Sequence, residues 1–231
     1  MGKASSKLEN LWYHHKWLII ISLFFIVVLI IGIVQMSGGE KTDIRIVYCG
    51  SAVLDAEQRD AMESAFEQIM DRDFDGDGKK NVRLTALTIL SDKQIAEKKR
   101  EAAEDHDVLF YDPNTRNDTL VQLNTLLGSG ETIICLLEDH VYINLRNEGA
   151  FAKLEDIVGY VPDKIADDYS VRIGDTDFGK YFTAFDSILP ETRLCIRNMS
   201  VTAMMGNKKN TEKEYAYHKD MFCDIVKFTA P

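Results

Sequence analysis

Two polar segments of this sequence carry residues whose types and spacing could do chemistry. The first, residues 73–78, reads D-F-D-G-D-G and matches the D-x-D-x-D-G opening of an EF-hand calcium loop. Carboxylates that alternate with other residues can converge on one hard cation, and the last glycine permits a sharp turn. The predicted calcium ligands are Asp73, Asp75, Asp77, the backbone carbonyl of Lys79, and Asn81.

The calcium motif is only half complete. Leu84 stands at the twelfth position, where an EF-hand loop has a bidentate glutamate, and the chain continues as a strand pattern instead of a second helix. The alternative is therefore a metal-free polar loop, rich in turn-forming residues, between a helix and a strand. If calcium binds, we expect a weak site that fixes the loop, in the millimolar range typical of extracellular modules.

The second segment, Glu138-Asp139-His140, directly follows an apolar run that we predict to be a buried strand. Gly50 and Ser51 follow another such run. In open α/β sheets ligands bind beyond the carboxyl ends of the strands, so we expect these five residues to share one ligand-binding rim. Glu138, Asp139 and His140 would suit acid/base chemistry, but the absence of a partner nucleophile favours the alternative, a helix cap in a solvated turn.

No further catalytic motif supports an enzyme. The sequence has no G-x-S-x-G, H-E-x-x-H, P-loop or nucleotide-binding glycine motif, and we predict a non-catalytic protein. Of the four cysteines, Cys49, Cys135 and Cys195 lie in apolar, strand-like runs, which favours free, buried thiols. A disulfide such as Cys49–Cys195 is the alternative, because spacing alone does not decide pairing.

Hydrophobic periodicity predicts the elements that position these residues. Strands are expected at 43–49, 82–90, 131–137 and 194–197, a short extended segment at 108–111, and helices at 55–70, 93–104, 115–127, 141–147 and 212–228. Residues 162–180 and 198–210 look like loops. Because strand and helix alternate in the first half, we predict one α/β sandwich domain over residues 43–231, with a mostly parallel sheet.

The N-terminal region contains an uninterrupted apolar run, WLIIISLFFIVVLIIGIV, at residues 17–34. A helix of about 18 such residues is long enough for the ~30 Å hydrocarbon core of a bilayer, so we predict a single transmembrane helix at residues 17–36. A buried core helix and a cleavable signal peptide are the alternatives. Lysines precede the run, which predicts a cytoplasmic segment 1–16, a tether at 37–42, and a domain outside the cell membrane.

Net charge restricts the partners. The 231 residues carry a formal net charge of −10, which argues against nucleic acid and against anionic lipid for the predicted outer domain. The predicted partners are the membrane itself, through one helix, and either a small solute or another membrane protein.

Residues 43–158 resemble extracellular solute-binding proteins of bacterial ABC importers. The resemblance comes from the pattern IRIVYCGSAVLDAEQRDAMESAFEQIM, from the turn GSGE at 128–131 that precedes the apolar run, and from GAFAKL at 149–154. It implies an α/β lobe that holds a ligand at a cleft. Members of that family have two lobes, whereas only one lobe fits this chain.

Three functions follow as hypotheses. The first is a membrane-anchored, extracytoplasmic binding or interaction module related to solute-binding proteins. The second is a structural accessory subunit of a membrane transporter or secretion complex, which docks protein instead of small molecules. The third, a hydrolase that uses the rim of Glu138 and His140, is the least supported. A small-molecule binder needs a partly apolar pocket, and a docking subunit needs an exposed apolar patch.

Overall fold

The structure, a computed structural model, describes residues 17, 20–30, 42–74, 76–104, 113–130, 132–162, 165–199 and 201–231. The chain divides into two compact units, Met1–Lys41 and Thr42–Pro231. The predicted extended segment at residues 108–111 lies outside the described residues, as does Asp75 of the predicted calcium loop.

The structure contradicts the prediction of a transmembrane helix at residues 17–36. Within the described ranges, no helix combines the length and the apolarity needed to cross a membrane. The described helix there covers residues 20–30 without a break. Residues 18–19 and 31–36 of the predicted span lie outside the described residues.

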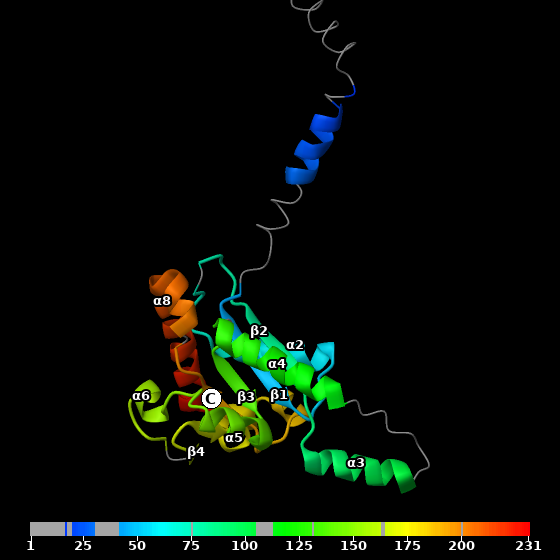
Figure 1. The fold of residues 1–231 in the computed structure, drawn as a ribbon. Helices are drawn as coiled ribbons and strands as arrows, with labels where there is room; N and C mark the ends of the chain where they lie inside the picture. Colours follow the sequence, from blue (N-terminus) through cyan, green and yellow to red (C-terminus); the bar gives the residue numbers. More distant parts are fainter. Residues whose placement is uncertain are drawn as a thin grey trace, which may run out of the picture. The chain divides into compact units, whose positions relative to one another are not determined.

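The second unit is an α/β domain built on a mixed six-stranded sheet (Figure 1). The strands, in spatial order, are β2 (Val82–Thr88), β1 (Ile44–Gly50), β3 (Ile134–Leu137), β6 (Arg193–Ile196), β5 (Ser170–Arg172) and β4 (Ile165–Asp167). β1 pairs in parallel with β2 and β3. The pairs β3–β6, β6–β5 and β5–β4 are antiparallel.

The mixed sheet corrects the prediction of a mostly parallel one. The antiparallel half includes β4 and β5, which come from residues that the sequence pattern assigned to a loop. Each has three residues, which is too few for a hydrophobic period to be recognised in the sequence. Only Asp168 and Tyr169 connect them, and so short a connection permits an antiparallel hairpin but no parallel crossover.

Helices cover both faces of the sheet. One face packs against α2 (Ala56–Ile69), α6 (Leu154–Val158), α7 (Asp177–Tyr181) and α8 (Val201–Lys227). The other packs against α4 (Pro113–Ser129) and α5 (Asp139–Asn147). Successive residues of β1 supply the two cores: Tyr48 lies in the first and Cys49 in the second, as the two-residue repeat of a strand requires. The structure has all four cysteines as free thiols, with Cys49, Cys135 and Cys195 buried.

α8 is longer than the predicted helix, because it begins at Val201 and includes residues that the pattern assigned to a loop. Residues 207–211, Asn-Lys-Lys-Asn-Thr, are polar and have no apolar stripe of their own. Extending an existing helix costs far less than nucleating one, so a segment attached to an anchored helix continues it despite weak propensity. The anchor is the C-terminal half, where Met221, Phe222 and Ile225 are fully buried.

Two crossovers on opposite faces of the sheet create a topological switch point. The connection from β1 to β2 passes through α2 on the first face. The connection from β2 to β3 passes through α3 (Asp92–Glu104) and α4, and α4 packs on the second face. β1 lies between β2 and β3, so the first connection runs from β1 to β2 and the second runs back across β1 to β3. The carboxyl ends of β1 and β3 therefore meet where open α/β sheets bind ligands.

A buried histidine joins α8 to β1. His218 is fully buried, and its Nε2 accepts a hydrogen bond of 3.0 Å from the backbone N–H of Arg45. Its Nδ1 lies 2.8 Å from the carbonyl oxygen of Glu214, so Nδ1 carries the proton and donates it there. Burial lowers the pKa of His218 from 6.5 to about 4, so the ring is neutral at pH 7.

The first prediction concerns stability at acidic pH. Between pH 6.5 and pH 4 the unfolded chain protonates residue 218 and the folded chain does not, so stability falls as the pH falls through this window. From pH 7 to pH 5 we expect His218 to account for a loss of about 2 kcal/mol in the free energy of unfolding. Urea denaturation of wild type and His218→Gln at both pH values measures this, because the variant lacks that component. An equal loss in the two proteins would contradict the prediction.

Candidate functional site

The Glu138 carboxylate lies at the seam between β1 and β3. Its backbone N–H donates to the carbonyl of Cys49 at 3.0 Å, which continues the pairing of the two strands past their ends. Its Oε1 accepts hydrogen bonds of 2.6 Å from both the backbone N–H and the hydroxyl of Ser51. The hydroxyl of Tyr48 donates to the same oxygen at 3.3 Å. The side chain of Glu138 is only 5% exposed.

Gly50 leaves the space that this carboxylate occupies. A Cβ atom at position 50 would lie 2.6 Å from Oε1 of Glu138 and 2.5 Å from the hydroxyl oxygen of Tyr48, both closer than real Cβ atoms approach. Of the five predicted rim residues, the structure thus brings Gly50, Ser51 and Glu138 into direct contact.

The second oxygen of Glu138 is held more loosely. Oε2 accepts one long hydrogen bond, 3.4 Å, from Nε2 of Gln94, and Nδ1 of His140 lies 3.7 Å away. Gln94 sits in the first turn of α3, where its amide oxygen accepts from the backbone N–H and the hydroxyl of Ser91. The cap of α3 therefore positions the amide group that contacts Glu138.

His140 is partly buried and neutral. Burial, with a further contribution from Arg116, lowers the pKa of His140 below its usual value despite the opposing effects of Glu138 and of the Ile89 backbone. The carboxylate beside Nδ1 favours a proton there, which leaves a lone pair on Nε2. Nε2 is shielded from water and has no hydrogen-bond partner.

Asp139, the remaining predicted rim residue, is engaged with a different group. Its Oδ1 lies 2.6 Å from Nε of Arg193, the first residue of β6, in an ion pair. Nη1 of Arg193 also lies 3.9 Å from a carboxylate oxygen of Asp167. Asp139 and Asp167 therefore share the charge of this arginine.

A pocket of about 290 Å³ opens beside these groups. Its walls come from the ends of β2 and β3 and from the turn before β6, and they comprise Ser91, Gln94, Glu138, Asp139, His140, Leu189, Glu191 and Thr192. Thr192 is fully buried, and its hydroxyl has no hydrogen-bond partner. Among the described residues, the two buried side-chain atoms without partners, Nε2 of His140 and Oγ1 of Thr192, thus belong to walls of this one pocket.

Sequence reasoning missed five of these eight lining residues. Ser91 and Gln94 form an S-x-x-Q pattern directly after the second predicted strand, and that capping-box signal was available. Leu189, Glu191 and Thr192 carry no such signal. They reach the pocket because β6 runs antiparallel to β3, which pairs Arg193 with Leu137 and brings the start of β6 to the end of β3.

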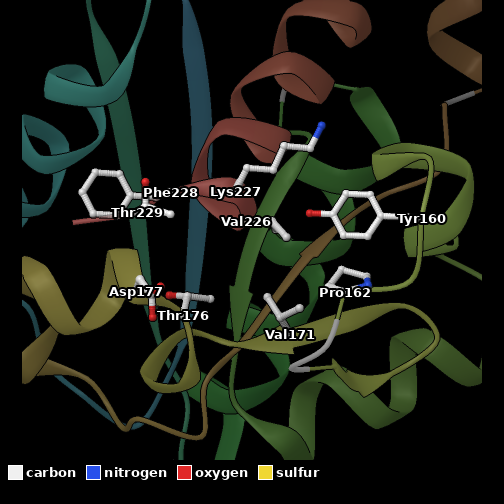
Figure 2. Close-up of a pocket in the computed structure, with 9 residues that line it drawn as sticks. All are labelled: Tyr160, Pro162, Val171, Thr176, Asp177, Val226, Lys227, Phe228 and Thr229. Carbon is white, nitrogen blue, oxygen red and sulfur yellow. The ribbon is translucent and has the colours of Figure 1, made fainter. Parts of the chain in front are cut away.

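Figure 2 shows another pocket, of about 280 Å³, between the end of α8 and the segment that contains Tyr160 and Pro162. Two polar side chains in this second pocket, Thr176 and Lys227, already have partners within the chain. The hydroxyl of Thr176 donates to the carbonyl of Ile173 at 2.7 Å and accepts from the N–H of Gly179 at 2.9 Å. Nζ of Lys227 lies 5.8 Å from the centroid of the Tyr160 ring. The pocket beside Glu138 is therefore the better candidate site.

The acidic loop is closed by hydrogen bonds to its own backbone. The two carboxylate oxygens of Asp73 accept from the N–H groups of Gly76 and Gly78 at 2.7 and 2.6 Å, and both glycines have positive φ angles. Oδ1 of Asp77 accepts from the N–H of Lys79 at 2.9 Å.

The buried carboxylate of Asp43 ties the two ends of this loop together. It accepts from the backbone N–H groups of Phe74 and Asn81, each at 3.0 Å. Within the described residues, which omit Asp75, no group of three or more His, Cys, Asp or Glu side chains is placed to hold a metal ion. The calcium site stays a prediction.

No family model, curated protein or solved structure matches this chain. The predicted resemblance of residues 43–158 to solute-binding proteins therefore stays a prediction, and the geometry described above is the basis for the functional argument.

The second prediction tests the acidic loop. If Asp73, Asp75 and Asp77 share a calcium ion, calcium at ten times its Kd stabilises the folded chain by about 1.4 kcal/mol, which raises the Tm by a few degrees. Asp75→Ala should abolish this rise because it removes a ligand and leaves the hydrogen bonds of Asp73 in place.

Thermal unfolding of the full chain with and without about 10 mM calcium measures the effect, a concentration above the range of most extracellular modules. Asp71→Ala, which removes a neighbouring exposed carboxylate, is the control and should keep the rise. A wild-type Tm that does not respond to calcium would identify the loop as a polar turn.

Proposed function

We propose that residues 42–231 form a non-catalytic binding domain that holds a small molecule in the pocket beside Glu138. The observation that carries this proposal is the concentration of unsatisfied polar groups at that one place. A buried polar atom without a partner costs about 1–3 kcal/mol, and proteins pair nearly all of theirs. Nε2 of His140 and Oγ1 of Thr192 are both of this kind, and both residues line the pocket at the switch point of the sheet.

Geometry favours binding over catalysis at this site. The hydroxyl of Ser51 donates to Oε1 of Glu138, an oxygen that also accepts from the Ser51 backbone and from Tyr48. An oxygen that already accepts three hydrogen bonds has its lone pairs occupied by groups of the chain itself. Ser51 and Glu138 therefore suit a rigid binding wall better than a nucleophile and its base.

The size of the pocket indicates the class of ligand. About 290 Å³ lies just below the ~300–1,000 Å³ of ordinary ligand sites, so the pocket suits a small metabolite better than a protein segment. Leu189, which is 44% exposed, supplies an apolar wall at the edge. The alternative function, a docking subunit of a membrane complex, stays a prediction from the sequence.

A direct experiment detects the ligand. We expect native mass spectrometry of the full chain, purified without extensive dialysis, to show a mass increment of a small molecule that is lost on denaturation. Ligand-observed NMR with a panel of sugars, polyols, amino acids, carboxylic acids and amines then identifies the class. Absence of both a bound mass and any panel binder would contradict the proposed function.

A third prediction uses the partnerless hydroxyl of Thr192. Thr192→Val removes a hydroxyl that has no hydrogen bond, so the free energy of unfolding should stay unchanged or rise by up to about 1 kcal/mol. The matched control is Thr176→Val, whose hydroxyl makes two hydrogen bonds, and it should lower the free energy of unfolding by about 1–3 kcal/mol.

Chemical denaturation of the full chain measures both variants in the absence of ligand. If Thr192→Val destabilises the chain as much as Thr176→Val does, then the Thr192 hydroxyl serves the fold, and it is no evidence for a ligand.

A further inference from the structure

The charges around the pocket do not balance. Its lining contains the carboxylates of Glu138, Asp139 and Glu191 and no lysine or arginine. Asp139 is paired with Arg193, and Glu191 is exposed to water, which leaves Glu138 as the buried charge in question. Among the residues that the structure describes, the ion-pair contact of Glu138 is with His140, and that ring is neutral at pH 7 because its pKa is lowered.

A buried carboxylate without a cationic neighbour is unfavourable unless hydrogen bonds or a counter-charge stabilise it. Three donors satisfy Oε1 of Glu138, whereas Oε2 has one long hydrogen bond from Gln94. Oε2 is therefore the oxygen of Glu138 that can accept further hydrogen bonds.

The two neighbouring atoms without partners can both accept hydrogen bonds. The neutral ring of His140 presents a lone pair at Nε2, and a threonine hydroxyl such as that of Thr192 can accept as well as donate. The missing partner is thus a group with several N–H or O–H donors and a positive charge. A primary ammonium group has three donors, no acceptor and one charge, and it meets all of these requirements.

We propose, building on the proposed function of this pocket, that its ligand is a small primary amine whose ammonium group binds at Oε2 of Glu138. The ammonium group supplies the counter-charge that the described chain does not provide. The remainder of the ligand lies against Leu189 at the edge of the pocket.

Isothermal titration of the full chain with 1,4-diaminobutane, and with butane-1,4-diol as a neutral compound of the same length, tests this proposal. The buffer contains about 150 mM salt, which screens non-specific attraction of cations to a chain with a net charge of −10. We expect saturable binding of the diamine with one site per chain, and binding of the diol weaker by about tenfold or more, because a hydrogen bond to a charged group exceeds a neutral one.

Two variants of equal charge change locate the site. Glu138→Gln removes the buried charge and should weaken diamine binding by about tenfold or more. Glu57→Gln removes an exposed charge on α2, and it should bind the diamine as wild type does. Should Glu138→Gln fail to fold, methyl NMR of the wild-type chain replaces it, with shifts of the Thr192 and Leu189 methyl groups expected on adding diamine.

Three results would overturn the proposal: the diol binds as well as the diamine, Glu138→Gln binds the diamine as tightly as Glu57→Gln does, or the methyl groups of Thr192 and Leu189 do not respond. The same experiments distinguish a failure of this proposal from a failure of the proposed function. If a neutral or acidic panel compound binds this pocket and the diamine does not, the ammonium inference is wrong and the binding function stands. If no compound binds, both are wrong.

Discussion

The two hydrogen bonds from Ser51 to Glu138 fix the centre of the domain, because they join the ends of β1 and β3 beyond the last pair of the sheet. The chain reaches this arrangement only with glycine at position 50, where a side chain would displace the carboxylate. α5 begins directly after Glu138, and the carboxylate makes no capping hydrogen bond to that helix. A charged group that many partners hold in place is rigid, and rigidity at the end of a strand is what a binding wall requires.

The parallel half of the sheet could be predicted from the sequence, and the antiparallel half could not. β1 and β3 are apolar on both faces, and a central parallel strand is distinguished by this continuous pattern. β4 and β5 have three residues each, and their position depends on tertiary pairing with β6. The N-terminal prediction failed for a different reason. Hydropathy reports the apolarity of residues 17–36, whereas no helix among the described residues is both long and apolar enough to cross a membrane.

The same distinction explains which site residues the sequence revealed. Ser51 and Glu138 follow predicted parallel strands, so the rule that ligands lie beyond carboxyl ends was sufficient to place them together. Thr192 precedes a strand, and that rule assigns it to the opposite edge of the sheet. Only the antiparallel direction of β6 brings Thr192 beside Glu138, and a direction is a property of the fold that no local pattern contains. The charge imbalance of the pocket depends on these contacts, so it could not be predicted from the sequence either.

The unsatisfied groups of the pocket contrast with the rest of the interior. His218 has both ring nitrogens paired, Asp43 accepts two backbone hydrogen bonds, and the hydroxyl of Thr176 makes two. The same chain therefore satisfies buried polar side chains wherever they only support the fold. The deficit at His140 and Thr192 is local, and it coincides with a buried carboxylate whose second oxygen is held by one long bond. Among the described residues, this deficit distinguishes the walls of the pocket from the rest of the interior.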